Sequence, residues 1–64
     1  MWKFELWHEG NCLHEEEGFE TEAEAEEEGQ QSAKDRIEMW KADDAWHGEN
    51  VEDFDIKVIE FWPL

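Results

Sequence analysis

The sequence predicts a small α+β domain with the element order β-β-α-β, in which one long helix packs on one face of a three-stranded antiparallel sheet. This prediction rests on three features of the chain. Residues 2–8 alternate between apolar and polar side chains, the glutamate-rich middle carries helix-capping signals, and residues 52–62 return to alternation. The 64 residues are expected to form a single acidic domain over residues 1–64, because a chain of this length can build only one small core.

The first two strands are expected to form a hairpin. Over residues 2–8, one face carries Trp2, Phe4 and Leu6, and the other carries Lys3, Glu5 and Trp7. Glu9-Gly10-Asn11 favours a tight turn, since Gly and Asn tolerate a positive φ. A second strand over about residues 12–17 is weakly apolar, so we place it at a sheet edge, where its carboxylates would discourage edge-to-edge association.

A helix is expected from about residue 21 to about residue 44. Thr21 and Glu24 have the spacing of a capping box, and acidic residues fill the first turn, where the helix dipole favours them. Gly48 is a reasonable stop, and residues 47–50 are predicted to form the loop that follows.

One arc of this helix should face the sheet, and it carries Ala33, Ile37 and Trp40. Extended backwards, the arc reaches Gly29 and then Glu26 and Glu22, and these two carboxylates are too polar to bury. Two alternatives follow: the helix bends at Gly29, or its first two turns project past the sheet into water.

The last strand is expected over residues 52–62, with Pro63 ending it. One face would carry Phe54, Ile56 and Val58, and the other Ile59 and Phe61. The helix crosses over so that this strand pairs beside the first one, which makes the first strand central.

Charge excludes several function classes. Twenty Asp or Glu against five Lys or Arg give a formal net charge of −15, which argues against direct binding to nucleic acid or to an anionic membrane. No stretch reaches the apolar length of a membrane span, and the N-terminus lacks the apolar region of a signal peptide. The single cysteine, Cys12, cannot close an internal disulfide. We therefore expect a cytoplasmic protein.

Neither catalysis nor a cofactor is expected from the motifs. The chain has no nucleophile elbow, phosphate loop or dinucleotide fingerprint, and its carboxylates crowd on predicted solvent-facing surface instead of in two different environments. His8, Cys12 and His14 flank the predicted turn, but their spacing matches no specific zinc pattern and lacks a fourth ligand. We therefore predict a protein that is not an enzyme and holds no metal.

Two apolar groups fall outside the predicted core: Met39, Ala42 and Trp46 on the back of the helix, and Trp7, Ile59 and Phe61 on the far face of the sheet. They are either half-exposed structural side chains or a surface for a partner or a second copy. We expect a monomer because of charge repulsion, with a dimer through the second apolar face as the alternative.

The acidic run is the most informative segment. Nine of the fourteen residues from Glu15 to Glu28 are glutamate, and no Lys or Arg occurs between Lys3 and Lys34. At 1.5 Å per helical residue, the six carboxylates from Glu20 to Glu28 amount to about one charge per 2 Å, against about one per 1.7 Å along duplex DNA. Such a surface could occupy a groove built for phosphates.

In size and charge the whole chain resembles the small acidic inhibitors encoded by phages and mobile elements, including anti-CRISPR and anti-restriction proteins that mimic DNA. The segment from Glu15 to Glu28 is the part of the chain that most resembles these inhibitors. The resemblance implies a stoichiometric blocker that sits in a DNA-binding channel and prevents target engagement, in the host cell cytoplasm if the protein is phage-encoded. These inhibitors share no common fold, so the resemblance assigns no residue roles.

The leading hypothesis is a DNA-mimicking inhibitor of a nucleic-acid-targeting defence complex, such as an anti-CRISPR that blocks target-DNA binding. Its partner would be a basic nucleic-acid-binding protein, a CRISPR effector or a similar complex, contacted by the phosphate-mimicking side chains Glu15, Glu16, Glu17, Glu20, Glu24, Glu27, Glu28, Asp35 and Glu38. Trp7, Trp46 or Phe61 could add an aromatic contact. The alternative is an acidic partner subunit, antitoxin-like or an adaptor, that binds a basic protein through an aromatic patch.

Overall fold

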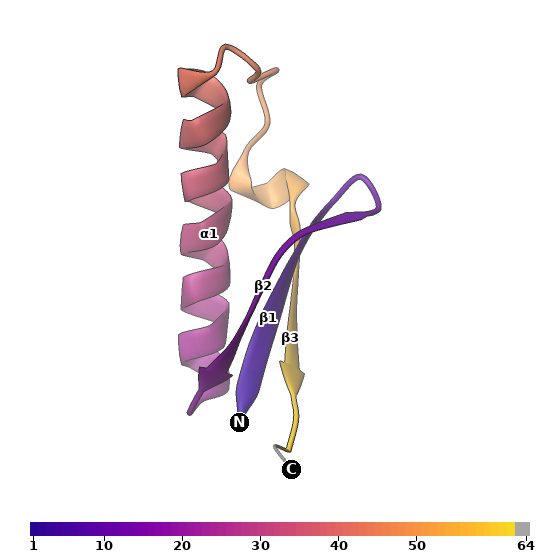
Figure 1. Cartoon of the computed structure of the whole chain (residues 1–64), viewed down its shortest axis with the longest axis vertical. Helices are drawn as coiled ribbons and strands as arrows, with labels where there is room; N and C mark the ends of the chain where they lie inside the picture. The colour runs from indigo at the N-terminus through magenta and orange to yellow at the C-terminus, as the bar shows by residue number, and fades with distance from the viewer. Residues whose placement is uncertain (63–64) are drawn as a thin grey trace.

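The computed structural model describes residues 1–62 and has the predicted α+β architecture. In chain order the elements are the strands β1 (Trp2–His8) and β2 (Asn11–Phe19), the helix α1 (Glu22–Ala42), a 3-10 helix (Val51–Asp53) and the strand β3 (Asp55–Glu60). The sheet is antiparallel in the order β2-β1-β3, and α1 lies along one of its faces (Figure 1). The predicted fold class and the central position of the first strand are confirmed.

The hairpin between β1 and β2 closes through a two-residue turn. Glu9 and Gly10 both have positive φ angles, of 50° and 81°, and His8 pairs with Asn11 across the turn. Two successive positive φ angles are typical of the turn whose twist matches that of the flanking strands. Asn11, predicted to lie in the turn, is instead the first residue of β2.

The strand β2 is longer than the predicted range of 12–17 because two irregularities extend it. The register with β1 shifts at two places, where Leu13 and Gly18 are the extra residues, and Gly18 takes a φ of 98°. Bulges of this kind bend an edge strand and re-aim its side chains. The first one lets Leu13 pack against the core while its carbonyl oxygen accepts a hydrogen bond from Arg36 Nη2 at 3.1 Å.

The strand β3 is shorter than the predicted range of 52–62 because a 3-10 turn precedes it. The Asp53 carboxylate accepts a hydrogen bond from the Asn50 backbone N–H at 2.8 Å, and the Asp53 N–H donates to the Asn50 carbonyl oxygen at 2.9 Å. This reciprocal cap closes the turn. It delivers Phe54 into the core, and Pro63 lies outside the described residues.

The core lies between the sheet and α1. Phe4 and Leu6 of the central strand are almost fully buried, and they pack with Ala33, Ile37 and Phe54. An aromatic cluster closes one end of this core, where the His8 ring lies 4.8 Å from Phe54 and the Trp40 ring lies 5.5 Å from Phe54. The predicted inward positions of α1 are confirmed, whereas Trp2 is only half-buried.

The helix α1 meets the sheet through small residues. Its buried positions are Ala25, Gly29, Ala33 and Ile37, spaced four residues apart. A Cβ atom on Gly29 would lie 2.6 Å from Ile56 Cγ2 and 3.4 Å from the Phe4 ring, so only glycine fits there. Neither sequence alternative is correct: α1 is one continuous helix, and its second turn is seated on the sheet through Ala25 while Glu22 and Glu26 remain exposed.

Both ends of α1 are capped, although the C-terminal cap differs from the predicted one. At the start, Thr21 Oγ1 accepts a hydrogen bond from the Glu24 backbone N–H at 3.2 Å. At the end, the Ala45 N–H donates to the Trp40 carbonyl at 2.7 Å and the Asp44 N–H donates to the Lys41 carbonyl at 3.2 Å. These bonds form a Schellman motif with Asp44 at its left-handed position, φ 56°. The helix therefore ends at Ala42, before Gly48.

Substituting Gly29 by Ala should destabilise the protein. The methyl group gains about 1 kcal/mol of helix propensity, but it overpacks the contact with Ile56 and Phe4. We expect a net loss of about 1–2 kcal/mol in the free energy of unfolding, measured by urea denaturation. Gln30→Ala, on the exposed side of the same turn, is the control and should not destabilise. A G29A variant as stable as the parent would mean that α1 packs less closely against Ile56 and Phe4 than described.

Substituting Asp44 by Gly should stabilise the protein. Glycine removes the strain of a left-handed Asp and also removes a negative charge at the negative end of the helix dipole. We expect a gain of about 1 kcal/mol in thermal or urea denaturation. Asp44→Asn removes only the charge, so its gain should be smaller. Equal stability of all three proteins would contradict the assignment of Asp44 as the helix stop.

Candidate partner-binding surfaces

The three glutamates of β2 do not share one face. Glu15 and Glu17 pair in register with Glu5 and Lys3, whose side chains face away from α1, whereas Glu16 pairs with Phe4 on the helix side. The alternation of a strand causes this separation. The predicted phosphate-mimicking set is therefore divided between two faces at β2, although all three side chains are exposed.

On α1, the predicted carboxylates lie outside the seam, which we define as the buried residues that face the sheet, Ala25, Gly29, Ala33 and Ile37. Glu24, Glu27 and Glu28 are exposed within about one turn of each other, and Asp35 and Glu38 are exposed further along the helix, with Lys34 between the two groups. Glu20, which the sequence placed on the same stripe, lies instead in the bend before Thr21. Five glutamates from Glu22 to Glu28 remain on the helix, so the density of about one carboxylate per 2 Å is kept there.

Several of the predicted carboxylates already have partners within the chain. Glu15 Oε2 lies 3.4 Å from Lys3 Nζ, Glu16 Oε1 lies 3.1 Å from His14 Nε2, and Glu38 Oε1 lies 3.7 Å from Lys41 Nζ. Asp35 accepts a hydrogen bond from Gln31 at 3.0 Å. The side chains of Glu17, Glu20, Glu24, Glu27 and Glu28 make no ion pair within residues 1–62.

Eight of the carboxylates that make no ion pair in residues 1–62 lie at one end of the molecule, and the others are spread over the second half of α1, the loop after it, the 3-10 helix and the start of β3. The end of β2, the start of α1 and the end of β3 lie together there, at the bottom of Figure 1. We call this region the acidic end and define it by Glu17, Glu20, Glu22, Glu24, Glu26, Glu27, Glu28 and Glu60. The sequence analysis did not include Glu60 in the predicted site because Glu60 is far along the chain from the acidic run Glu15 to Glu28. Its pairing with Trp2, which brings it here, follows from the predicted neighbourhood of the first and last strands.

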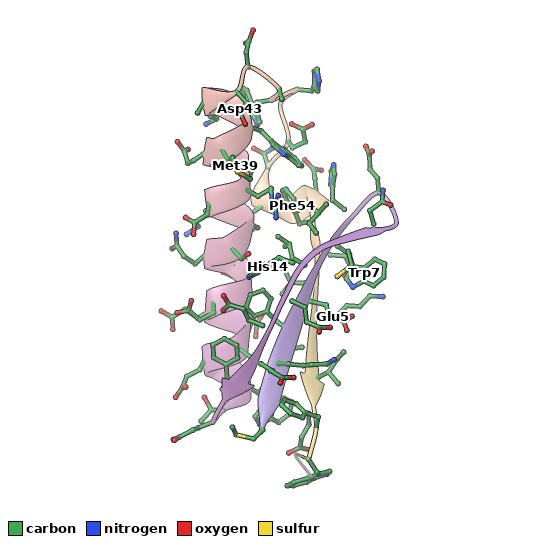
Figure 2. The ribbon with its side chains drawn as sticks, in the orientation of Figure 1. Glu5, Trp7, His14, Met39, Asp43 and Phe54 are labelled. Carbon is green, nitrogen blue, oxygen red and sulfur yellow. The ribbon has the colours of Figure 1, made fainter. Side chains whose placement is uncertain are left out.

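The sheet face opposite α1 is held by its own charges. Lys3 Nζ lies 3.5 Å from Glu5 Oε2, the Trp7 indole N–H donates to Glu5 Oε1 at 3.0 Å, and Lys57 Nζ lies 4.6 Å from the centre of the Trp7 ring. Figure 2 labels Glu5 and Trp7 on this side of the sheet. The Trp7 hydrogen bond, opposed by partial burial and aided by Lys3, holds the pKa of Glu5 below its usual value. For Lys3, desolvation lowers the pKa but is outweighed by Glu15 and Glu5, so its pKa is raised.

The predicted aromatic contacts are not grouped. Trp7 lies in the charged network, and Lys57 and Glu5 lie between it and Ile59 along the two strands, so Trp7, Ile59 and Phe61 do not form one apolar patch. Phe61 is half-buried just beyond β3. Trp46 lies near the opposite end of the molecule, in the loop after α1.

The contacts of Trp46 are made within its own loop. Its indole N–H donates to the Glu49 carbonyl oxygen at 2.9 Å, and Lys41 Nζ lies 4.7 Å from its ring centre. In the same loop, the His47 backbone N–H donates to Glu49 Oε2 at 2.8 Å and lowers the pKa of Glu49. Trp46 thus folds back where the helix ends, with about two fifths of its surface exposed.

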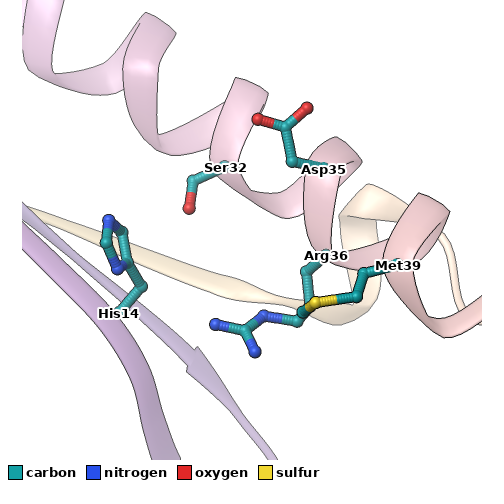
Figure 3. Close-up of a pocket in the computed structure, with 5 residues that line it drawn as sticks. All are labelled: His14, Ser32, Asp35, Arg36 and Met39. Atoms are coloured by element: carbon teal, nitrogen blue, oxygen red, sulfur yellow. The ribbon is translucent and has the colours of Figure 1, made fainter.

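A shallow groove of about 260 Å³ lies between β2 and α1, and it is lined by His14, Ser32, Asp35, Arg36 and Met39 (Figure 3). Arg36 bridges the two elements through its bond to the Leu13 carbonyl oxygen, and His14 contacts Glu16. Arg36 therefore holds β2 against the helix, while the contact of His14 with Glu16 stays within β2. Met39, grouped with Trp46 in the sequence analysis, belongs to this groove.

The residues weighed as metal ligands are separated by the sheet. Cys12 pairs with Trp7 on the face away from α1, while the His8 and His14 rings contact Phe54 and Phe4 on the helix side. In the described part of the chain, no three His, Cys, Asp or Glu side chains converge as metal ligands. Over the same residues, no helix combines the length and the apolar character needed to cross a membrane.

Comparisons with protein-family models, with curated proteins and with solved structures found no match to this chain. Any functional assignment therefore has to come from the arrangement of its own side chains.

Substituting Trp7 by Phe should raise the pKa of Glu5, because the indole N–H is the main group that lowers it. A carboxyl pKa lowered by folding adds stability above the unfolded-state pKa, and this stability is lost as pH falls through the folded value. The W7F protein should therefore lose less stability than the parent between about pH 6 and about pH 3. A carboxyl ¹³C NMR titration measures the pKa directly, with Trp46→Phe as the control. An unchanged Glu5 pKa in W7F would contradict the network.

Proposed function

We propose that this protein is a DNA-mimicking inhibitor that binds the positively charged DNA-binding channel of a nucleic-acid-targeting defence complex, acting as an anti-CRISPR that blocks target DNA. The observation that carries the proposal is the acidic end, where eight exposed glutamates lie together without an ion pair in the described part of the chain. Five other carboxylates are paired with lysine or histidine, and the remaining seven are spread over the second half of α1, the loop after it, the 3-10 helix and the start of β3. A cluster that is left unpaired costs self-repulsion, and a basic partner would remove that cost.

The dimensions of the protein support the same proposal. The chain has extents of 41 × 20 × 18 Å, and 41 Å corresponds to about twelve base-pair steps at 3.4 Å each. With a net charge of −15, the average is about one negative charge per 2.7 Å of length, less dense than duplex DNA. The acidic end is denser than this average, so we assign the phosphate mimicry chiefly to it.

Within the predicted site, the residues fall into two groups. Glu17, Glu20, Glu24, Glu27 and Glu28 belong to the acidic end and are assigned direct contacts with the Lys and Arg side chains of the partner. The remaining four, Glu15, Glu16, Asp35 and Glu38, already have partners in the chain and would have to exchange them on binding. We therefore assign this second group a smaller share of the binding free energy.

Reversing the charge of Glu24, Glu27 and Glu28 to Lys should cripple inhibition. These side chains are exposed and lie away from the seam, so the fold should persist, as circular dichroism can verify. We expect the affinity for a guide-loaded effector complex to fall at least about tenfold. The dependence of affinity on salt should also become shallower, because fewer counterions are exchanged.

The matched control reverses Glu9, Asp43 and Glu52, which are exposed at the other end of the molecule and change the net charge equally. This control should inhibit almost as well as the parent, and excess target DNA should compete with both proteins. Full inhibition by the acidic-end variant would exclude phosphate mimicry. A complex that survives both this reversal and high salt would instead favour the alternative of an acidic partner subunit held by aromatic contacts.

A further inference from the structure

An exposed apolar group lies at the same end of the molecule as the acidic end. Five large apolar side chains are exposed in residues 1–62, and three of them, Met1, Ile59 and Trp62, lie where β1 begins and β3 ends. Trp62 is the most exposed, at 77%. The other two, Met39 and Trp46, lie in or after the C-terminal half of α1. We call Met1, Ile59, Phe61 and Trp62 the apolar tip.

The backbone holds the apolar tip in place. Trp2 pairs with Glu60, and the Phe61 N–H donates to the Met1 carbonyl oxygen at 2.9 Å, which extends the β1–β3 pairing beyond both strands. Ile59 lies beside Lys3 on the sheet face away from α1. Met1 and Phe61 thus extend the sheet, and Trp62 follows directly after them in the chain.

The tip lies beside the acidic end of the molecule, with Lys3 next to Ile59 on the sheet. Glu60 lies between Ile59 and Phe61 in the chain, and the start of β1 and the end of β3 lie next to the end of β2 and the start of α1 (Figure 1). A tryptophan side chain can bury about 150–250 Å² of surface on binding, and such residues often dominate the affinity of an interface when polar groups surround them. An exposed tryptophan two residues from Glu60, at the same end of the molecule as the acidic end, matches one kind of partner, a basic surface with an apolar pocket.

We propose that the apolar tip, chiefly Trp62, anchors the protein in an apolar pocket of a basic protein while the carboxylates of the acidic end pair with Lys and Arg around that pocket. The proposal rests on the proposed function for the basic character of the partner. It adds the selective contact: charge alone would match any DNA-binding channel, and the tip restricts binding to channels that have an apolar pocket beside them.

Two synthetic peptides of equal length and charge test whether Trp62 supplies the apolar contact and the carboxylates supply the charge contact. One alternates leucine with lysine and the other alternates serine with lysine, six repeats each, and both carry a dye for fluorescence anisotropy. Both should bind the parent protein at low salt, and the leucine peptide should bind about tenfold more tightly. Trp62→Ala should remove that difference and leave the affinity for the serine peptide within about twofold. Because Trp62 is mostly exposed, this variant should melt at the parent temperature.

Trp46→Ala is the matched control, since Trp46 is also exposed but lies near the other end of the molecule. It should keep the preference for the leucine peptide. Equal affinity of the parent protein for both peptides, or the same loss in the two tryptophan variants, would overturn the proposed anchor and leave the phosphate mimicry standing. If reversal of Glu24, Glu27 and Glu28 leaves both peptides bound as before, the acidic end is not the basic-partner site, and the proposed function fails with the anchor.

Discussion

The close approach of α1 to the sheet at Gly29 is the contact on which the rest of the structure depends. A glycine flanked by Ala25 and Ala33 lets the helix backbone lie directly over Phe4 and Ile56. Only four of the 21 residues of α1 are buried, yet they seat the whole helix. The other positions are therefore available for charge, and a chain with this much glutamate can still fold around a few aromatic and aliphatic side chains.

The strong periodic signals in the sequence predicted most of this architecture. The alternation in residues 2–8, the Thr21 cap and the inward arc of α1 are confirmed because each depends on local chemistry. The errors arise where tertiary contacts decide. The two bulges of β2 depend on its pairing with β1, and the helix stop at Asp44 uses a left-handed residue that is not glycine. The predicted arc continued backwards from Gly29 to Glu26, whereas packing buries Ala25.

The candidate site was only partly predictable for the same reason. Exposure of the carboxylates follows from composition, but which of them stay unpaired depends on where the cations lie. Lys3 reaches Glu15 across the sheet, and Lys41 reaches Glu38 along the helix. The sequence run from Glu15 to Glu28 therefore differs from the spatial cluster, which excludes Glu15 and Glu16 and gains Glu60 from the far end of the chain.

The uneven placement of the cations has a consequence for encounters in solution. Three of the five cations, Lys34, Arg36 and Lys41, lie in the second half of α1, far from the acidic end at the start of the helix. The molecule is therefore an electric dipole as well as a polyanion. In the field of an approaching cationic surface, such a dipole experiences a torque that turns its more negative pole forward before contact. Productive orientations are thereby enriched among collisions, and the apolar side chains beside that pole arrive already aimed at the opposing surface.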